Sequence, residues 1–404
     1  MAGSSGENAD ELRDLIRILM KTVWHGGPAR KLARATPRSR INLSITPGVP
    51  LAIGQVEGVQ VVAEDRDRKR LARLRSMDET GTHEEACRAL RQIHEAGKFS
   101  PDHILIRDGF ARLSQPLDTE VYSDRRVPER PVRPPATRLL RSRGCTLQFF
   151  LTALFEAQCR TRPGRVAADN TRPLKQAADQ ASWVDLVGPD ADTAPMVSRH
   201  RAINARDRRV RQVRQALLTL AANDVQLVEF IKSKPDAPPR YHGFRLLHEA
   251  GRVIGDRVPY TVPMPTEQNL FSLDARLFTN GWVNVLKDTE LAFLCMVGDL
   301  QAREGYDAVP ITGRIRIGYY GLGTDGYQAH HLLQRTGLLQ IKRSKVRRPD
   351  GTFKAPDREA PYDLSGAPNS FCLVSDGFSQ PALPAIIRAL QRRWTLPPTP
   401  RRAD

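Results

Sequence analysis

The stretch GYYGLGTDGYQAHHLLQRTGLLQI, residues 318–341, decides the fold that we predict for the second half of the chain. Between Thr324 and Thr336 its apolar residues recur with the spacing of one helix face. Gly337 is placed for the left-handed residue that ends a helix, and a strand is predicted at 338–343. This helix either carries chemistry in its two adjacent histidines or lies against something long and charged.

A helical wheel separates the two faces of the predicted helix. Ala329, Leu332, Leu333 and Thr336 form the core stripe. The opposite face is expected to be exposed and free of acidic residues, and with its flanks it comprises Thr324, Tyr327, Gln328, His330, His331, Gln334 and Arg335. Such groups hydrogen-bond base edges and phosphates in a major groove, and Thr324 is expected to cap the helix. We therefore predict DNA contacts from Thr324, Tyr327, Gln328, His331 and Arg335.

Metal chemistry competes for the two histidines and is disfavoured. Adjacent helical residues differ by about 100°, so His330 and His331 are poorly placed to chelate one ion. No H-x-x-x-H or H-E-x-x-H spacing is present, and the GLGTDG run lacks the lysine of a phosphate loop. We expect no metal and no cofactor. An exposed histidine pair without a function stays open as the alternative.

Composition points to a polyanionic partner. The 404 residues carry a formal net charge of +17, with a pI of about 10.1. Such an excess suits nucleic acid or an anionic membrane surface. No apolar run of about 18 residues predicts a transmembrane helix, and the polar, acidic start does not resemble a signal peptide. The five cysteines form no C-x-x-C pair. We therefore expect free thiols and a cytoplasmic, nucleoid-associated protein without a membrane partner.

Two segments share one order of predicted elements. In the first, helices at 145–159, 182–188 and about 207–222 precede strands at 225–230 and 241–250. The second segment repeats this order, beginning with a buried helix at 288–304 that Asp288 is expected to cap. Three helices followed by two strands are the order of a winged helix, a helix-turn-helix variant with a β-hairpin behind it.

The third helix of the first segment is strongly basic. Six arginines lie between Arg201 and Arg214, with Asp207 the only acid. The face turned away from the apolar stripe holds Arg208, Arg211, Gln212, Arg214, Gln215 and Thr219. A solvated helix face usually alternates charge signs, so this one favours contact with nucleic acid over simple solvation. Thr219 aside, we predict that these residues contact DNA.

The loops between the paired strands are basic as well. The first loop carries Lys232, Lys234 and Arg240, and the second carries Lys342, Arg343, Lys345, Arg347, Arg348 and Lys354. Such wings lie along the phosphate backbone or enter the minor groove. Aromatic residues make up only 6% of the chain, which favours duplex DNA over base stacking on single strands.

The domain organisation predicted from these patterns is α+β. A small α+β domain at 1–122 should contain a helix at 10–24, strands at 40–46 and 49–64, a helix at 84–96 and a strand at 103–113. The apolar stripe of helix 10–24 packs onto its own domain or forms a homodimer. A Pro/Arg-rich linker at 123–144, a winged helix at 145–255, a linker at 256–273, a second winged helix at 274–380 and a helix with a basic tail at 381–404 complete the chain.

The region from about Thr146 to Phe378 resembles the tandem winged-helix replication initiators of plasmids and mobile elements in high-GC Gram-positive bacteria. The stretches that carry the resemblance are FFLTALFEAQCRTRPGR, SWVDLVG, RDRRVRQVRQALLTL, LFTNGWVNVLKDTELAFLCMV and AHHLLQRTGLLQI. The resemblance implies sequence-specific binding of double-stranded DNA, contact with a replication machinery and no enzymatic activity. Transcription regulators use the same module, so that alternative stays open.

An enzyme in the N-terminal domain, addressed to DNA by the winged helices, is the second alternative. Residues 89–114, ALRQIHEAGKFSPDHILIRDGFARLS, resemble a protein-kinase catalytic loop, but H-R-D, D-F-G and a Gly-rich loop are missing. Asp102 and Asp108 are available carboxylates without a recognisable catalytic arrangement.

Overall fold

The computed structural model describes residues 54–118, 121–124, 126–140, 144–175, 180–187, 196–198, 201–203, 205–231, 241–254, 257–343 and 368–395. The chain divides into two units, Met1–Glu57 and Gly58–Asp404, and almost all of the described residues belong to the second. The expected helix at 10–24, with its homodimer contact, and the expected strand at 40–46 lie outside the described residues.

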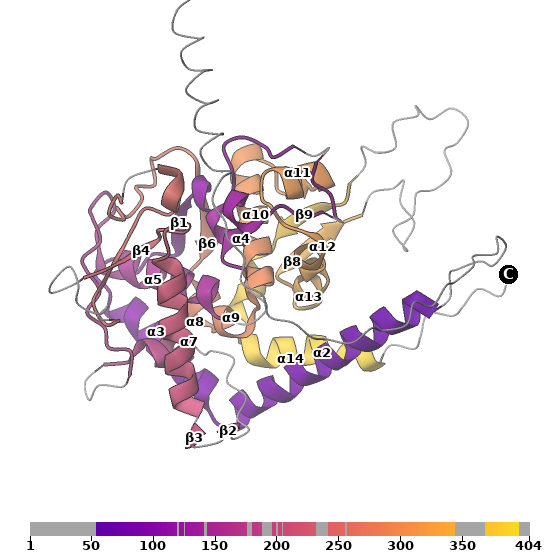
Figure 1. The fold of residues 1–404 in the computed structure, drawn as a ribbon, viewed down its shortest axis with the longest axis horizontal. Coiled ribbons are helices and arrows are strands. Elements are labelled where there is room, and N and C mark those ends of the chain that lie inside the picture. Colours follow the sequence, from indigo (N-terminus) through magenta and orange to yellow (C-terminus); the bar gives the residue numbers. More distant parts are fainter. Residues whose placement is uncertain are drawn as a thin grey trace, which may run out of the picture. The chain divides into compact units, whose positions relative to one another are not determined.

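Helices and strands both occur along the second unit, which confirms the α+β class (Figure 1). The elements of the first half are α2 (Gly54–Glu79), α3 (Thr82–Ala96), β1 (His103–Arg107), α4 (Pro135–Arg138), α5 (Thr146–Arg160), α6 (Trp183–Leu186), β2 (Met196–Ser198), β3 (Arg201–Ile203), α7 (Ala205–Leu220), β4 (Val228–Phe230) and β5 (Phe244–Leu246). Those of the second half are β6 (Leu270–Asp274), α8 (Arg276–Thr279), α9 (Trp282–Val285), α10 (Asp288–Glu304), β7 (Val309–Pro310), α11 (Gly313–Gly318), α12 (Thr324–Tyr327), α13 (Ala329–Arg335), β8 (Leu339–Lys342), β9 (Ser370–Leu373) and α14 (Ala382–Thr395).

Helices α5 and α10 form the centre of the core and pack against each other. Fourteen of the fifteen residues of α5 are buried. Asp288 was expected to cap α10, but Lys287 is the N-cap residue. The Asp288 carboxylate instead accepts hydrogen bonds from the amides of Leu147 (3.5 Å) and Gln148 (3.3 Å), in the first turn of α5. The Asp288 carboxylate therefore caps the N-terminus of α5, whose own N-cap residue makes no side-chain cap hydrogen bond.

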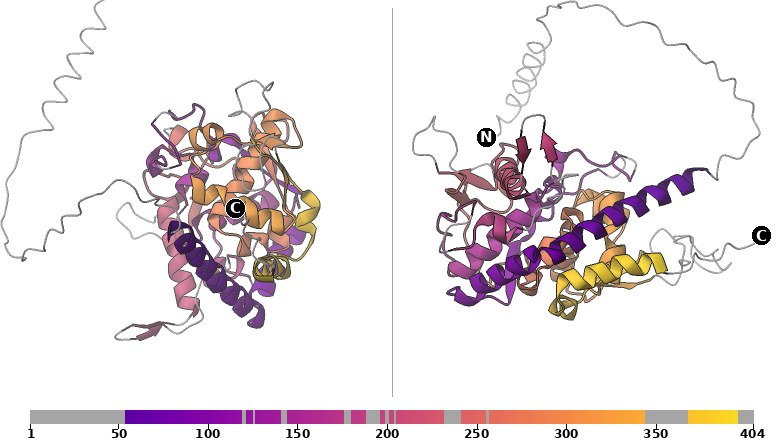
Figure 2. Two further views of the ribbon diagram at one scale, coloured as in Figure 1. Left: turned by 90° about the vertical axis from the view of Figure 1, so that its right-hand side faces the viewer. Right: turned by 90° about the horizontal axis from the view of Figure 1, so that it is seen from below.

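The first predicted group of elements is present. Helix α7 packs its apolar stripe against α5, and β4 pairs antiparallel with β5, with Phe230 opposite Phe244. A hairpin that the sequence did not predict, β2–β3, lies between α6 and α7. Figures 1 and 2 show it at the N-terminal end of α7.

The second group follows the predicted order with one additional strand. After α10 come β7, α11, α12, α13, β8 and β9, and the three strands form a sheet in the order β7-β9-β8. Both pairings are antiparallel, with Val309 and Ile341 opposite Phe371 from either side. The single helix expected from Thr324 to Thr336 is divided at Gln328 into α12 and α13. Gly337 has a φ of 79°, which confirms the left-handed residue after the helix.

The strand expected at 49–64 was wrong for residues 54–64, which belong to helix α2. The residues that follow are rich in Arg, Lys, Ala and Leu, which favour helix, and a Lys69–Asp65 pair at 2.7 Å adds support along one face. Valine disfavours a helix only slightly, so this run extends the helix back through the valine-rich part. The expected helix at 84–96 is confirmed as α3, and the strand expected at 103–113 ends at Arg107.

Strand β1 finds its partner far along the chain. It pairs antiparallel with β6 over its whole length, from His103 opposite Asp274 to Arg107 opposite Leu270. Gln158 of α5 supports β1 by accepting from the Leu105 amide (3.0 Å) and donating to the Leu105 carbonyl (2.7 Å). The division into three domains stays a prediction, but this sheet joins the predicted N-terminal domain to residues 270–274, which the division assigns to the second linker and to the first residue of the second winged helix.

The described residues of both expected linkers, 123–144 and 256–273, pack against the rest of the protein. In the first, Thr137 donates to the Tyr320 carbonyl (2.7 Å) and the buried Arg138 donates to the Asp224 carbonyl, so this segment contacts both groups of elements. In the second, Tyr260 is fully buried and its amide donates to the Leu246 carbonyl (2.9 Å). Proline and arginine content indicated an exposed chain, but both residue types pack well when their polar groups find partners.

All five cysteines are free, and four of them are buried. No helix in the described part of the chain has the length and apolar character needed to cross a membrane.

A buried ion pair fastens α2 to α10. Both guanidinium NH2 groups of Arg70 donate to the Glu290 carboxylate, at 2.6 and 2.8 Å, and Nη2 also donates to the Val285 carbonyl (2.8 Å). Burial would raise the pKa of Glu290, but Arg70 lowers it below its usual value. The same carboxylate accepts from the Lys287 amide (2.8 Å) and so completes the cap of α10.

Replacing Arg70 by Met should lower the free energy of unfolding by about 3–5 kcal/mol, because Glu290 keeps a buried charge without its cation. The double variant Arg70→Met/Glu290→Gln should recover part of this loss, since glutamine is neutral and still accepts from the Lys287 amide. Urea denaturation of the three proteins measures both effects. A double variant no more stable than the single one would contradict this account of the pair.

Candidate nucleic-acid interface

The first candidate surface is the outward face of α7. Arg211, Arg214 and Gln215 are exposed, and Arg208 and Gln212 are partly buried. Thr219, which was expected on this face, is buried and donates to the Gln215 carbonyl (2.8 Å). It lies there because its hydroxyl satisfies a helix carbonyl and its methyl group packs inward.

The ion pairs around α7 leave part of this face free. Asp207, the only acid of the run, pairs with Lys175 at 3.2 Å. The guanidinium of Arg214 lies over the ring of Tyr241, with its central carbon 5.3 Å from the ring centroid. A stacked guanidinium can still donate hydrogen bonds from its edge to an anion. Arg211 makes no hydrogen bond or ion pair with any residue that the structure describes, so its charge is open to an anion.

The second candidate surface is the outward face of α12 and α13. Thr324, Gln328, His331 and Gln334 are exposed, and Arg335 is partly exposed. Lys342 and Arg343 are exposed at the end of β8, directly beyond this helix pair. Asp325 is exposed too, so the prediction of a face without acids was wrong. The division at Gln328 changes the phase of the wheel and turns Asp325 outward.

Tyr327 and His330 belong to the core side of this helix pair. Tyr327 is partly buried, with its ring centroid 6.2 Å from Phe293 and 6.0 Å from Phe371. His330 is buried, and desolvation lowers its pKa to about 4, so it is neutral at pH 7. The sequence placed both residues outside because the wheel did not include the aromatic side chains that α10 and β9 bring to this point.

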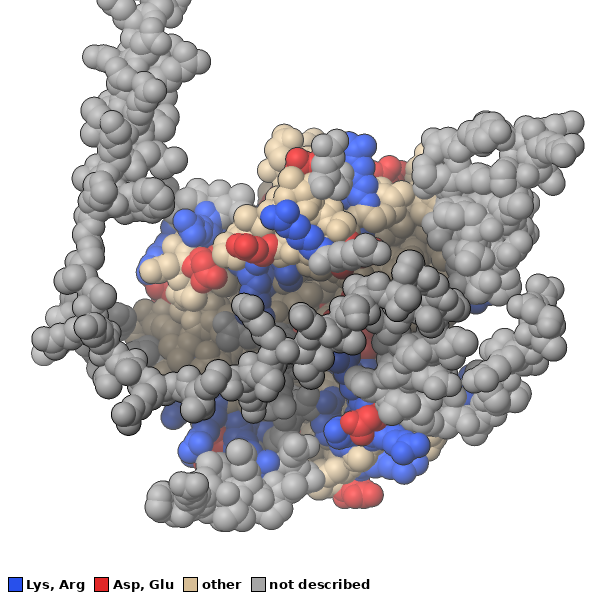
Figure 3. Space-filling model, turned by 45° about the vertical axis from the view of Figure 1, so that its right-hand side comes forward, with Lys and Arg blue, Asp and Glu red and all other residues tan. Residues whose placement is uncertain are grey.

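The remaining predicted DNA contacts lie outside the described residues. These are Lys232, Lys234, Arg240, Lys345, Arg347, Arg348 and Lys354. On the part of the surface visible in Figure 3, Lys and Arg form separate patches with Asp and Glu between them.

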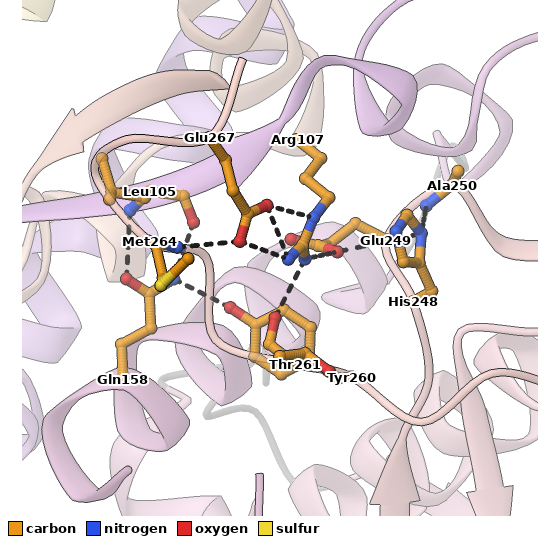
Figure 4. A network of polar contacts seen from close by, with 10 residues as sticks. All are labelled: Leu105, Arg107, Gln158, His248, Glu249, Ala250, Tyr260, Thr261, Met264 and Glu267. Atoms are coloured by element: carbon orange, nitrogen blue, oxygen red, sulfur yellow. Dashed lines mark hydrogen bonds and ion pairs between the residues drawn. The ribbon is translucent and has the colours of Figure 1, made fainter. Parts of the chain in front are cut away.

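A buried polar network that the sequence did not predict surrounds Arg107 (Figure 4). The Arg107 guanidinium donates to Glu249 (2.9 Å), Glu267 (3.0 Å) and the Thr261 carbonyl (2.9 Å). Burial raises the pKa of Glu249, against the opposing effect of Arg107, and burial also lowers the pKa of the adjacent His248 to about 4. The Arg107 guanidinium therefore donates its hydrogen bonds to groups within the protein, and the network joins β1 to residues 248–267.

Enzymatic chemistry receives little support from the described residues. Asp108 pairs with Arg303, while Asp102 is exposed on the loop before β1. A cavity of about 240 Å³ lies between β6, α8, α10 and β9, below the roughly 300–1,000 Å³ typical of ligand pockets. Its carboxylate, Asp274, is held by Arg276 at 2.6 Å. Within the described ranges, no group of three or more His, Cys, Asp or Glu residues is arranged to hold a metal ion.

Comparison with known proteins adds no relative. No protein-family model, no curated protein and no solved structure matches this chain.

Truncating Tyr327 tests its assignment to the core. Tyr327→Ala should lower the free energy of unfolding by about 2 kcal/mol, because it leaves a cavity between Phe293 and Phe371. Gln328→Ala, one residue further on an exposed face, should change it by less than about 0.5 kcal/mol. Chemical denaturation distinguishes the two, and equal stability of both variants would show that the ring of Tyr327 contributes no packing.

Proposed function

We propose that this chain binds double-stranded DNA sequence-specifically through two winged helices. The observation that carries the proposal is the polar stripe of Gln328 and α13, with Gln328, His331 and Gln334 exposed at three-residue intervals. Amide and imidazole groups at this spacing suit the donor and acceptor pattern of base edges. A stripe built only for solubility would more commonly carry Lys and Glu.

The surroundings of this stripe support a winged-helix assignment. The order α10, α11, α12/α13, β8 and β9 is that of three helices followed by a β-hairpin, and β7 adds a third strand beside β9. Lys342 and Arg343 lie at the base of the loop between β8 and β9, where a wing would approach phosphate. In the first group, α5, α6 and α7 precede the β4–β5 hairpin, which supports the same assignment.

The two surfaces suit different parts of DNA. The α7 face is dominated by guanidinium groups, which match phosphate geometry, whereas the α13 face is dominated by amides and imidazole. We therefore assign phosphate anchoring to α7, through Arg211 and Arg214, and base reading to α13, through Gln328 and His331. Tyr327, which packs inward, has no part in reading.

The biological role that we propose is initiation of plasmid or mobile-element replication, with a transcription regulator as the alternative. This step rests on the sequence resemblance alone. A marker plasmid carrying DNA from around the gene should replicate only when the full chain is supplied. A regulator would instead change expression from a reporter joined to the same DNA, without supporting replication.

Binding to duplex DNA should depend steeply on salt. If about six to ten phosphates are neutralised, affinity should fall by about 10³–10⁵-fold between roughly 50 and 200 mM salt. Fluorescence anisotropy with a labelled duplex measures this. A flat salt response would count against the DNA-binding proposal as a whole.

Variants of the two surfaces should have different effects on DNA binding, one on affinity for all sequences and the other on sequence preference. Arg211→Ala should weaken binding to all sequences alike and reduce the salt slope by about 0.9, because one phosphate contact is lost. Gln328→Ala should leave the slope unchanged and relax sequence preference by about 1–3 kcal/mol at particular base pairs. Binding to a selected site and to mixed-sequence duplex, each as a salt series, separates these effects. Identical behaviour of the two variants would contradict the assigned division.

A further inference from the structure

A strap formed by residues 121–124 and 126–140 lies against the turn between α11 and α12. Thr137 donates to the Tyr320 carbonyl (2.7 Å) in this turn. Gly321 and Gly323 seat the strap: a Cβ at Gly321, whose φ is 59°, would lie 2.8 Å from the Arg133 side chain, and one at Gly323 would lie 2.7 Å from Val127. Gly321 and Gly323 of the GLGTDG run are therefore explained by close packing of the strap, whereas Gly326 makes room for the Leu322 side chain of the same turn.

Asp124 of the strap reaches the start of α12. Its Oδ1 atom accepts from Arg316 Nη2 (2.6 Å) and from the Thr324 hydroxyl (2.8 Å). Two reciprocal backbone hydrogen bonds between Ser123 and Arg126, both 3.1 Å, form the tight turn that presents the carboxylate. The Arg316 side chain is 5% exposed, whereas that of Asp124 is 54% exposed. The anion is thus at the surface, and the cation that holds it is nearly buried.

Arg316 keeps its position through contacts that do not involve Asp124. Its Nη1 donates to the Leu322 carbonyl (2.6 Å), and its guanidinium carbon lies 4.9 Å from the centroid of the Tyr327 ring. Removal of Asp124 would leave Nη2 in place beside the Thr324 hydroxyl, with no anion. A guanidinium and a hydroxyl that converge on one point are a common pair of donors to a phosphate oxygen.

We propose that Arg316 and Thr324 form a binding site for a DNA backbone phosphate, which Asp124 occupies in the free protein. The proposal rests on the DNA-binding function argued above. The Asp124 carboxylate stands where a phosphate oxygen would accept the same two hydrogen bonds. It also places a negative charge beside Thr324, at the start of α12. Duplex DNA can use this site only after displacing the strap turn, so the strap lowers the affinity of the second module.

Competition of this kind has a defined thermodynamic form. A protein whose binding-competent state is only fractionally populated shows an affinity reduced by that fraction. Weakening the hold of Asp124 on Arg316 should raise the open fraction and tighten binding. A strap that is a permanent brace would behave in the opposite way, because its loss would loosen α12 and weaken binding.

The test compares Asp124→Asn with Asp325→Asn in the full chain. Asp325 is exposed one residue after Thr324, and its replacement removes the same charge without touching Arg316. Binding to mixed-sequence duplex DNA is measured by anisotropy over a salt series, beside the unchanged protein. Asp124→Asn should tighten binding at least about fivefold and steepen the salt slope by about 0.9, since one further phosphate is engaged. Asp325→Asn should give a much smaller gain and an unchanged slope.

Three outcomes would overturn the proposal. Equal gains from both variants would assign the effect to general charge. Unchanged or weaker binding by Asp124→Asn, with the unchanged protein still binding, would make the strap a brace and leave the DNA-binding function standing. No binding by any of the three proteins at low salt would overturn both proposals. If Asp124→Asn does not fold, Asp124→Ser, which is smaller and also neutral, carries the same comparison.

Discussion

The Asp288 carboxylate joins the two helices on which the rest of the chain depends. It begins α10 and accepts from the first-turn amides of α5, so these two long core helices start against each other. Helix α5 is buried on every side and must be covered all round, because an exposed apolar helix would not be stable in water. Helices α3, α7 and α9 and strand β1 provide this cover. The two groups of elements are therefore built around one shared core.

The sequence predicted the elements whose faces repeat locally. The apolar stripe of α7 and the apolar runs of α5 and α10 predicted the right helices, because these patterns report burial wherever the covering residues come from. Pairing between distant segments leaves no such pattern. Strand β1 and its partner β6 lie more than 160 residues apart, and the sequence offered no reason to join them. The valine-rich start of α2 was misread because strand propensity is outweighed by the strong helix formers that follow.

The sequence predicted which residues of the candidate interface are exposed only where contacts within one helix decide it. Gln328, His331 and Arg211 are exposed as the wheels predicted, since their neighbours on the helix are enough to fix which face is turned away. Tyr327 and His330 were misplaced because the side chains that cover them come from α10 and β9. The Arg316–Asp124 pair joins residues 192 positions apart, and a proline- and arginine-rich run predicts a linker rather than a carboxylate aimed at α12. Such pairs become visible only when the chain is folded.

The shared core has a consequence for how DNA would be read. Modules on a flexible tether can adjust their separation, and their joint affinity then depends on tether length. Here the Gln148 side chain donates from Nε2 to the Asn284 Oδ1 atom (2.8 Å) across the interior, and the strap contacts both groups through Arg138 and Thr137. Breaking these contacts would expose buried polar groups, which is costly, so the separation of α7 and α13 is fixed by the fold. If both modules bind DNA, their half-sites must lie at one spacing. Adding half a helical turn of DNA between the half-sites should then abolish joint binding, and a full turn should not restore it.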